Sequence, residues 1–254
     1  MTPRSFLLAG AVLVTAATPF LARAAEFSAP QRSEIETIVR EYLISHPEVL
    51  QDAMAELEKR QNAAVAEKGK AAVKQYSQAL FMSPRQVTLG NHNGDVTFVE
   101  FFDYNCSYCK RAMSDMVELM KNDGKLKFVL KEFPVLGEGS VQAAQVAAAV
   151  RMQDKTGKKY LEFHQKLLGG RGQADKTRAL AVAKEIGLDV ARIEKDMAGD
   201  EVKATIEESF KLAEALGLNG TPSYVVGTDV VIGAVGANTL KEKINSARCG
   251  KATC

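Results

Sequence analysis

The stretch at residues 96–109 reads VTFVEFFDYNCSYC, and it decides the fold of this chain. Its first half, residues 96–102, is a run of β-branched and aromatic side chains that predicts a buried strand. Cys106 and Cys109 follow directly and open a segment with helical periodicity. A C-x-x-C pair at a strand-to-helix junction is typical of a redox-active dithiol.

The position of Cys106 predicts a reactive sulfur. Free N–H groups and the helix dipole favour negative charge at a helix N-terminus, so we expect a lowered pKa and nucleophilic attack by the Cys106 thiolate. Cys109 lies one turn later on the same face, where it would act as the more buried resolving thiol. The alternatives are a structural metal knuckle, which needs a second ligand pair, and a static disulfide.

Glu100 is the candidate proton carrier of this site. It alternates in phase with Phe98 and Phe102, so it shares their face of the predicted strand. If that face is core, the carboxyl group is buried, its pKa is raised, and it can exchange protons with Cys109. In the alternative, Val99 and Phe101 face the core and Glu100 faces solvent.

The rest of the chain predicts an α/β fold with a mixed sheet. The helix that starts at the cysteines ends near residues 122–124, and residues 125–130 predict a second strand, which completes a right-handed βαβ unit. Residues 138–216 are almost wholly helical in pattern. Residues 223–232 then predict a β-hairpin, and a last helix is expected at about 240–246.

A polar helical region precedes this body, and we assign residues 25–84 to a stalk and linker. His46-Pro47 divides the stalk into two segments. In the second segment, mostly apolar or small residues alternate spacings of four and three: Leu50, Met54, Leu57, Gln61, Ala64, Lys68 and Ala71. This seam predicts self-association; the alternative is an amphipathic helix lying on its own domain. Gly69 is a candidate hinge between stalk and body.

The first residues have the pattern of a signal peptide, which we assign to residues 1–24. Arg4 gives a positive start, residues 6–20 are largely apolar, and Ala22-Arg23-Ala24 has the small-x-small form of a cleavage site. The alternative is a membrane anchor, but spanning needs about twenty residues and this run is shorter. We therefore expect a soluble protein exported to the periplasm, an oxidising compartment.

Composition excludes some classes of function. With 33 Lys and Arg against 31 Asp and Glu, the net charge of +2 is too small for a nucleic-acid binder. The histidines His46, His92 and His164 have no metal-ligand spacing, so we expect solvated or capping roles and no metal site. For Cys249 and Cys254 we favour a local structural disulfide; the alternatives are a metal or copper contact, an interchain bond and a relay to Cys106.

Three motifs resemble the DsbA-like thiol–disulfide oxidoreductases, and they occur in the expected order. Residues 100–109 resemble the active-site strand and helix start, residues 133–137 (FPVLG) the segment before the helical insertion, and residues 220–222 (GTP) the cis-proline loop. The similarity covers residues 85–248. It implies a thioredoxin fold with an inserted helical domain at about 138–216, within a catalytic domain of residues 85–254.

The N-terminal stalk further resembles the subset of that family related to the suppressor of copper sensitivity protein C. This resemblance implies a homo-oligomer, with a trimer favoured over a dimer, and isomerase activity. The Ser107-Tyr108 pair differs from the Pro-His pair of the strongly oxidising prototype.

The resemblance also implies roles for individual residues. Glu100 matches the family's buried acid. A cis peptide bond between Thr221 and Pro222 would turn the Thr221 backbone towards Cys106, where it can pair with an extended substrate. From their position beside the cysteines, Tyr104 and Tyr108 are candidates for an aromatic rim that binds apolar peptide.

The expected function is that of a periplasmic disulfide isomerase or reductase. It would act on unfolded or misfolded secreted proteins with cysteines, would be reset by a membrane redox partner, and would need no cofactor besides its dithiol. The alternatives are a dithiol oxidase, a copper-tolerance protein that binds Cu(I) through the same soft sulfurs, and a stalked structural protein with inert cysteines.

Overall fold

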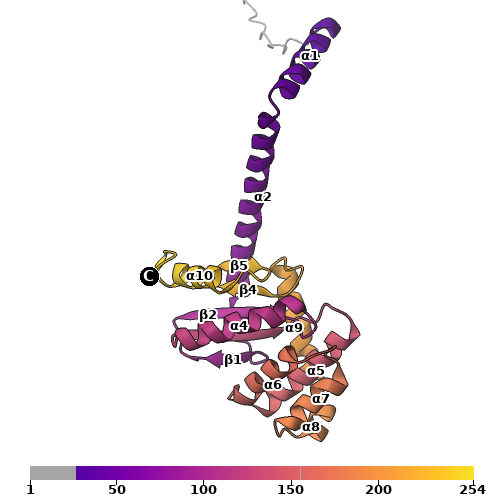
Figure 1. Cartoon of the computed structure of the whole chain (residues 1–254), viewed down its shortest axis with the longest axis vertical. Helices are drawn as coiled ribbons and strands as arrows, with labels where there is room; N and C mark the ends of the chain where they lie inside the picture. Colours follow the sequence, from indigo (N-terminus) through magenta and orange to yellow (C-terminus); the bar gives the residue numbers. More distant parts are fainter. Residues whose placement is uncertain (1–26, 155) are drawn as a thin grey trace, which may run out of the picture. The chain divides into compact units, whose positions relative to one another are not determined.

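The computed structural model describes residues 27–154 and 156–254 (Figure 1). The expected signal peptide lies outside the described residues. The chain divides after Leu57 into two compact units, which we describe separately. No helix of the described ranges is both long and apolar enough to cross a membrane.

The N-terminal unit contains α1 (Ala29–Ser45) and the start of α2 (Glu48–Gln75). The two helices separate at His46-Pro47, as predicted, since proline disfavours helical backbone in the residue before it. α1 buries none of its residues. Large apolar side chains therefore stay exposed on it: Ile35, Ile38, Val39, Tyr42 and Ile44.

The C-terminal part of α2 belongs to the second unit and packs there. Gly69, Ala72 and Val73 are buried. A Cβ atom at Gly69 would lie 3.1 Å from Cγ2 of Val230, so glycine permits this close approach. α2 continues unbroken through Gly69, and the expected hinge at this residue is therefore wrong. The short helix α3 (Ser77–Phe81) follows.

The second unit is built on a five-stranded mixed sheet with the order β1-β3-β2-β4-β5. β2 and β3 are parallel, and the other neighbours are antiparallel. α4 (Ser107–Asn122) connects the parallel pair, so the predicted βαβ unit is present. The strands are β1 (Val87–Gly90), β2 (Val96–Phe102), β3 (Leu126–Glu132), β4 (Ser223–Val226) and β5 (Asp229–Ile232).

Both faces of β2 are buried, which explains its continuous apolar run. Phe98 and Phe102 face the core that also contains Cys109. Val99 and Phe101 face a second core, formed with the end of α2, with α3 and with α9 (Asp200–Ala215). The strand therefore fixes which side chains can reach the cysteines.

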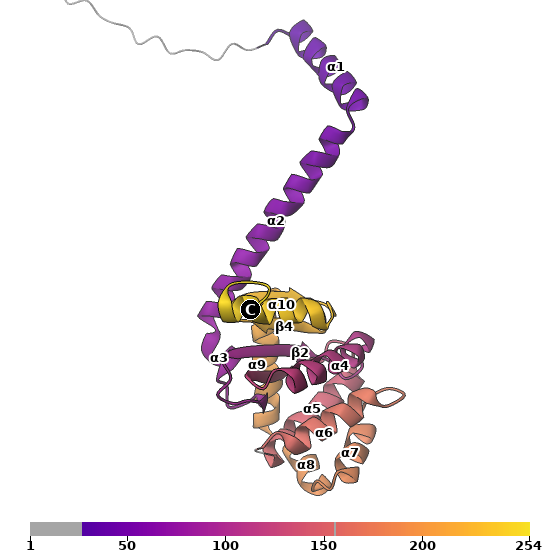
Figure 2. The same ribbon diagram turned by 60° about the vertical axis from the view of Figure 1, so that its left-hand side comes forward.

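Five helices lie between β3 and β4, where the sequence predicted a helical insertion. The last helix, α10, follows the β4–β5 hairpin, and α4 contacts both α10 and α6 (Figures 1 and 2). Cys249 at the end of α10 forms a disulfide with Cys254. The bounds are α5 (Glu138–Gln153), α6 (Lys158–Gly169), α7 (Lys176–Glu185), α8 (Val190–Asp196), α9 (Asp200–Ala215) and α10 (Ala237–Cys249).

Candidate active site

The two cysteines lie where β2 ends and α4 begins. Cys106 is the N-cap residue of α4, and Cys109 is in its first turn. The Cys106 N–H donates to the Asp103 carbonyl at 3.1 Å, which turns the chain from strand into helix. Both cysteines are free thiols; Cys106 keeps 6% of its surface exposed and Cys109 none. Only Cys106 can therefore meet a substrate directly.

The environment of Cys106 favours the thiolate. A hydrogen bond from Cys109 has the largest effect and lowers the pKa of Cys106 to about 5, although partial burial opposes it. The Thr221 hydroxyl and the N–H groups of Tyr108 and Cys109 also favour the anion. These two N–H groups lie in the first turn of α4, in agreement with the predicted effect of the helix N-terminus.

Cys109 has the opposite character. Its thiol donates to Cys106, and this hydrogen bond together with burial raises the pKa of Cys109 above its ordinary range. The negative charge of Glu100 acts in the same direction. One sulfur of the pair is therefore prepared to attack, while the other holds its proton until it must act.

Glu100 is buried on the face of β2 that carries Phe98 and Phe102, as the strand phase predicted. Burial raises its pKa to about 8, with smaller contributions from the charges of Asp115 and Cys106. Its cross-strand neighbour is Tyr224 of β4, whose hydroxyl is buried without a hydrogen-bond partner. A carboxyl group of this kind can gain or lose a proton near neutral pH.

The Thr221–Pro222 peptide bond is cis, as the resemblance implied. The loop places the Thr221 carbonyl 3.2 Å from Sγ of Cys106, whose thiol donates to it. Ser223 closes the loop by donating its hydroxyl to the Gly220 carbonyl at 2.7 Å. The backbone of residues 220–222 therefore borders the reactive sulfur.

The two tyrosines beside the dithiol have different positions. Tyr108 is 54% exposed, and the guanidinium carbon of Arg111 lies 4.6 Å from its ring centroid. Tyr104 is only 1% exposed and packs edge-on against Phe102. The expected aromatic rim is therefore wrong for Tyr104, because its side chain packs against Phe163 and His164 of the helical insertion instead of facing solvent.

His164 also differs from the prediction, since it is buried rather than solvated or capping. It packs edge-on against Phe102, and burial lowers its pKa to about 3. Its Nδ1 lies 3.4 Å from the Tyr104 hydroxyl, which is 3.4 Å from that of Tyr160. Tyr160 donates to Glu132, which completes a buried polar chain that no sequence pattern indicated.

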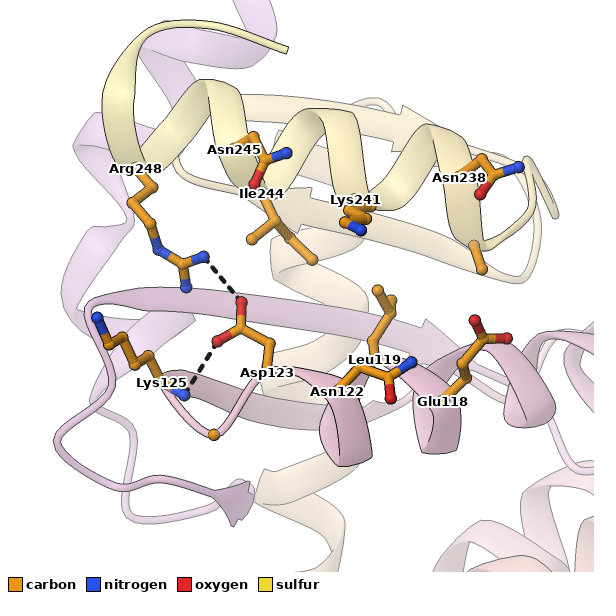
Figure 3. A pocket seen from close by; sticks show the side chains of 12 residues that line it. Glu118, Leu119, Asn122, Asp123, Lys125, Asn238, Lys241, Ile244, Asn245 and Arg248 are labelled. Atoms are coloured by element: carbon orange, nitrogen blue, oxygen red, sulfur yellow. Dashed lines mark hydrogen bonds and ion pairs between the residues drawn. The ribbon is translucent and has the colours of Figure 1, made fainter. Parts of the chain in front are cut away.

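A hollow of about 480 Å³ lies between α4 and α10 (Figure 3). Leu119 and Ile244 face each other across it, and Arg248 points to Asp123, with Nη1 and Oδ2 2.8 Å apart. Because these residues lie at the C-terminal end of α4, the hollow is separate from the cysteines at the N-terminal end. Among the described residues, no cluster of three or more His, Cys, Asp or Glu could hold a metal ion.

The sequence and the structure of this chain are similar to those of known proteins. Residues 97–245 match the family model of the DSBA-like thioredoxin domain, and residues 31–64 match that of the copper resistance protein ScsC N-terminal domain. A thioredoxin-like oxidoreductase from Silicibacter pomeroyi DSS-3 is 46% identical; the match covers 67% of this chain and 96% of that chain, with a TM-score of 0.64. The thiol-disulfide exchange protein alpha-DsbA2 from Wolbachia pipientis is 33% identical, covering 70% and 95%, with a TM-score of 0.65.

A linker-deletion mutant of Proteus mirabilis ScsC resembles more of the chain. It is 25% identical, and the match covers 89% of this chain and 98% of that chain with a TM-score of 0.65. Curated relatives include the Na(+)/H(+) antiporters NhaA 1 of Salinispora arenicola and NhaA of Herminiimonas arsenicoxydans, each 26% identical. The chain spans only 24% and 26% of the length of these two antiporters.

Proposed function

Because this chain belongs to the DSBA-like thioredoxin domain family, we propose that it is a thiol–disulfide oxidoreductase with Cys106 as its reactive sulfur. The observation that carries the proposal is the contrast between two neighbouring sulfurs. Cys106 has a pKa of about 5 and a little exposed surface, whereas Cys109 is fully buried and its pKa is raised.

The exchange needs no group outside the dithiol and its substrate. The Cys106 thiolate attacks a substrate disulfide, so a Cys106–substrate bond forms, the substrate S–S bond breaks, and the leaving sulfur takes a proton. Cys109 loses its proton and attacks Cys106, which releases the second substrate thiol and leaves a Cys106–Cys109 disulfide. Two electrons pass to the substrate, and the reverse sequence oxidises a substrate dithiol. When a different thiolate of the substrate attacks the mixed disulfide before Cys109 does, a new S–S bond forms in the substrate, the Cys106–substrate bond breaks, and the disulfide is isomerised.

Glu100 is our candidate for the group that moves the proton of Cys109. The charge of Glu100 contributes to the raised pKa of Cys109, so the two groups are close enough to interact. A carboxylate with a pKa of about 8 is a stronger base than an ordinary one and can accept the Cys109 proton during resolution. This role requires the buried placement that β2 provides.

The Thr221 backbone is our candidate for substrate binding. Its carbonyl accepts a hydrogen bond from the Cys106 thiol, and this bond is lost when the sulfur ionises or joins a substrate. The freed carbonyl can then accept from a substrate N–H, as when an extended segment adds to a sheet edge. Such pairing reads little side-chain identity, which suits unfolded or misfolded secreted proteins. Tyr108, two residues after Cys106 in the sequence, offers an exposed ring for apolar residues.

For the direction of the reaction we favour isomerisation or reduction. The protein would act as a homo-oligomer, and we favour a trimer over a dimer. The match of residues 31–64 to the ScsC N-terminal domain and the exposed apolar side chains of α1 support association through the stalk. The disulfide between Cys249 and Cys254 agrees with a location in the periplasm, which is an oxidising compartment. A membrane redox partner would reset the dithiol there. A dithiol oxidase remains the alternative within this chemistry.

A trapping experiment tests the proposed chemistry. In Cys109→Ser the resolving sulfur is absent, so incubation with a peptide disulfide is expected to leave a stable adduct on Cys106, which mass spectrometry locates. Cys106→Ser is the matched control and should form no adduct on its buried sulfur. An adduct on Cys109 alone, or none in either variant, contradicts the proposal.

Copper binding is a second candidate for the same dithiol. The similarity of residues 31–64 to a copper resistance domain favours it, and two thiolates suit the soft ion Cu(I). Cu(I) titration of the wild type and of Cys106→Ser tests it: binding should need Cys106. Equal binding by both proteins contradicts a copper site at the dithiol.

A further inference from the structure

The loop between α6 and α7 lies beside the start of α4, where the reactive cysteine is. Asn105, the residue before Cys106, donates from Nδ2 to the Ala174 carbonyl at 2.8 Å and accepts at Oδ1 from the Ala174 N–H at 2.7 Å. One turn after Cys106, Lys110 donates from Nζ to the Gly170 carbonyl at 3.4 Å. Contacts on both sides of the cysteine in the sequence therefore hold the two ends of this loop.

Arg178 of α7 fixes the shape of the same loop. Its Nη1 donates to the Gly172 carbonyl at 2.7 Å, and its Nη2 donates to the Leu167 carbonyl at 3.2 Å. A Cβ atom at Gly170 would overlap Nη2 of Arg178, so the absence of a side chain there lets the guanidinium group lie against the loop. Arg171, the next residue in the loop, is exposed. The loop therefore adds two guanidinium groups to the surface beside the start of α4.

Lys110, Arg171 and Arg178 form a group that we call the basic rim. In the described part of the chain, none of the three forms an ion pair with a carboxylate, whereas the neighbouring Lys176 pairs with Glu194 at 3.3 Å. The net charge of the whole chain is only +2, so the excess of positive charge at the rim is local. Cations grouped without a counter-charge attract anions and speed their encounter with the protein.

The carboxylate nearest to the rim in the sequence does not neutralise it. Oδ1 of Asp175 accepts from the Arg178 N–H at 2.9 Å and so caps α7. The Cys106 thiolate is itself negative and would repel an acidic substrate, because like charges at close range oppose one another. The basic rim offsets this repulsion on the side of Cys106 where the loop lies. The surface around the sulfur therefore suits a substrate with carboxylates near its disulfide.

We propose that the basic rim binds carboxylate side chains of the substrate, so that protein disulfides flanked by Asp or Glu are the preferred substrates. This inference rests on the proposed function and refines its substrate. Lys110, Arg171 and Arg178 act as binding residues for the polypeptide around the reacting cysteine. The exchange of sulfur bonds itself stays with Cys106 and Cys109.

The test uses two peptide disulfides that differ only in the residue beside each cysteine, which is Glu in one and Gln in the other. Dividing each kcat/KM by the rate with dithiothreitol removes the intrinsic reactivity of the peptide. The wild type should prefer the Glu peptide about tenfold at about 0.01 M salt and lose most of this preference at about 1 M salt, where the Debye length is only about 3 Å.

Arg171→Glu replaces attraction by repulsion at an exposed position, and it should lower the preference for the Glu peptide about fivefold. The matched control is Lys195→Glu, which changes the net charge equally at an exposed position on α8. α8 lies on the far side of the helical insertion from α4 (Figures 1 and 2), so the preference of this variant should equal that of the wild type. Equal changes in the two variants overturn the inference.

Lys110→Gln tests the rim from α4 and should lower the preference about threefold. Any effect of this change on the Cys106 sulfur acts on both peptides and cancels in their ratio. A wild type that reacts with both peptides without preference overturns the inference and leaves the proposed function intact, whereas no reaction with either peptide overturns both. Binding to phosphatidylglycerol vesicles that Arg171→Glu abolishes, with an unchanged peptide preference, would assign the rim to a membrane and overturn the inference.

Discussion

At the scale of single residues, the charge on Cys106 depends on its partner more than on the helix. The hydrogen bond from Cys109 is the largest cause of the low pKa, ahead of the helix N–H groups. We expect Cys109→Ala to raise the pKa of Cys106 by about one unit or more, because the donor is lost. The pH dependence of alkylation measures this shift. Ser107→Ala is the control, and a pKa that stays near 5 in Cys109→Ala contradicts the assignment.

Glu100 makes folding stability depend on pH in a direction that can be predicted. Its carboxyl has a pKa of about 8 when folded and an ordinary value when unfolded, so the folded state binds the extra proton and loses stability as pH rises between these values. Glu100→Gln should therefore gain stability over the wild type with rising pH, by up to about 5 kcal/mol at pH 9.

Urea denaturation across the same pH range measures the Glu100 effect. Glu118→Gln, an exposed position on α4, is the matched control and should follow the wild type. A constant difference between Glu100→Gln and the wild type would show that the carboxyl titrates normally.

His164 should make folding stability depend on pH in the opposite direction, at acid pH. Its pKa is about 3 when folded, so between that value and its ordinary one the unfolded state binds more protons and stability falls as pH falls. His164→Phe should remove about 2 kcal/mol of this loss at pH 5, after any packing change measured at neutral pH is subtracted. His92→Phe, in an exposed turn, is the control. Parallel pH profiles for wild type and His164→Phe contradict the account.

The sequence predicted the residues whose placement depends on local geometry. Strand phase put Glu100 with Phe98, and the strand-to-helix junction put Cys106 at an N-cap. The predictions for Tyr104 and His164 were wrong, because the burial of these side chains depends on helices far along the chain. Three of the four donors to Asp103 come from residues 135–140, more than thirty residues along the chain, so no local pattern could indicate these contacts.

At the scale of elements, the long periodic segments and the β4–β5 hairpin were predictable, whereas other short elements were not. β1 has four residues and exists through its antiparallel pairing with β3, a contact that no local pattern encodes. The short helices α3 and α8 likewise depend on packing against the rest of their unit. The break between the two stalk helices at Pro47 was predicted, whereas the packing of the C-terminal end of α2 on β5 was not.

The contact between α2 and β5 depends on the absence of a side chain at Gly69. Gly69→Leu should destabilise the protein by about 1–3 kcal/mol, because a branched side chain has no room beside Val230. Ala63→Leu, at an exposed position of the same helix and outside the predicted seam, is the control and should change stability little. Thermal unfolding measures both. If Gly69→Leu equals Ala63→Leu, the close approach of helix and strand is absent.

At the scale of the whole molecule, we propose that self-association through the stalk determines whether the dithiol isomerises disulfides. Removing residues 25–77 would also remove Ala72 and Val73 from the core, so the truncation must stop at residue 57, where the compact units divide. The truncated protein should be monomeric and keep thiol exchange, but fail to rescue scrambled ribonuclease. Light scattering and a refolding assay measure the two properties.

A point variant separates association from chain length. Ile38→Asp puts a charge on the exposed apolar face of α1 and should dissociate the oligomer in the full chain. Arg40→Asp, about 200° around the helix, is the control and should leave the mass in solution unchanged. Isomerase activity that persists in a monomeric Ile38→Asp protein contradicts the role of the stalk.

The proposed chemistry requires a negative charge on Cys106 at neutral pH. Titration of the thiolate absorbance in the ultraviolet, with Cys106→Ser as blank, measures this charge. We expect a midpoint near pH 5 that disappears in the blank. A midpoint of about 8.5, that of an ordinary cysteine, would contradict it.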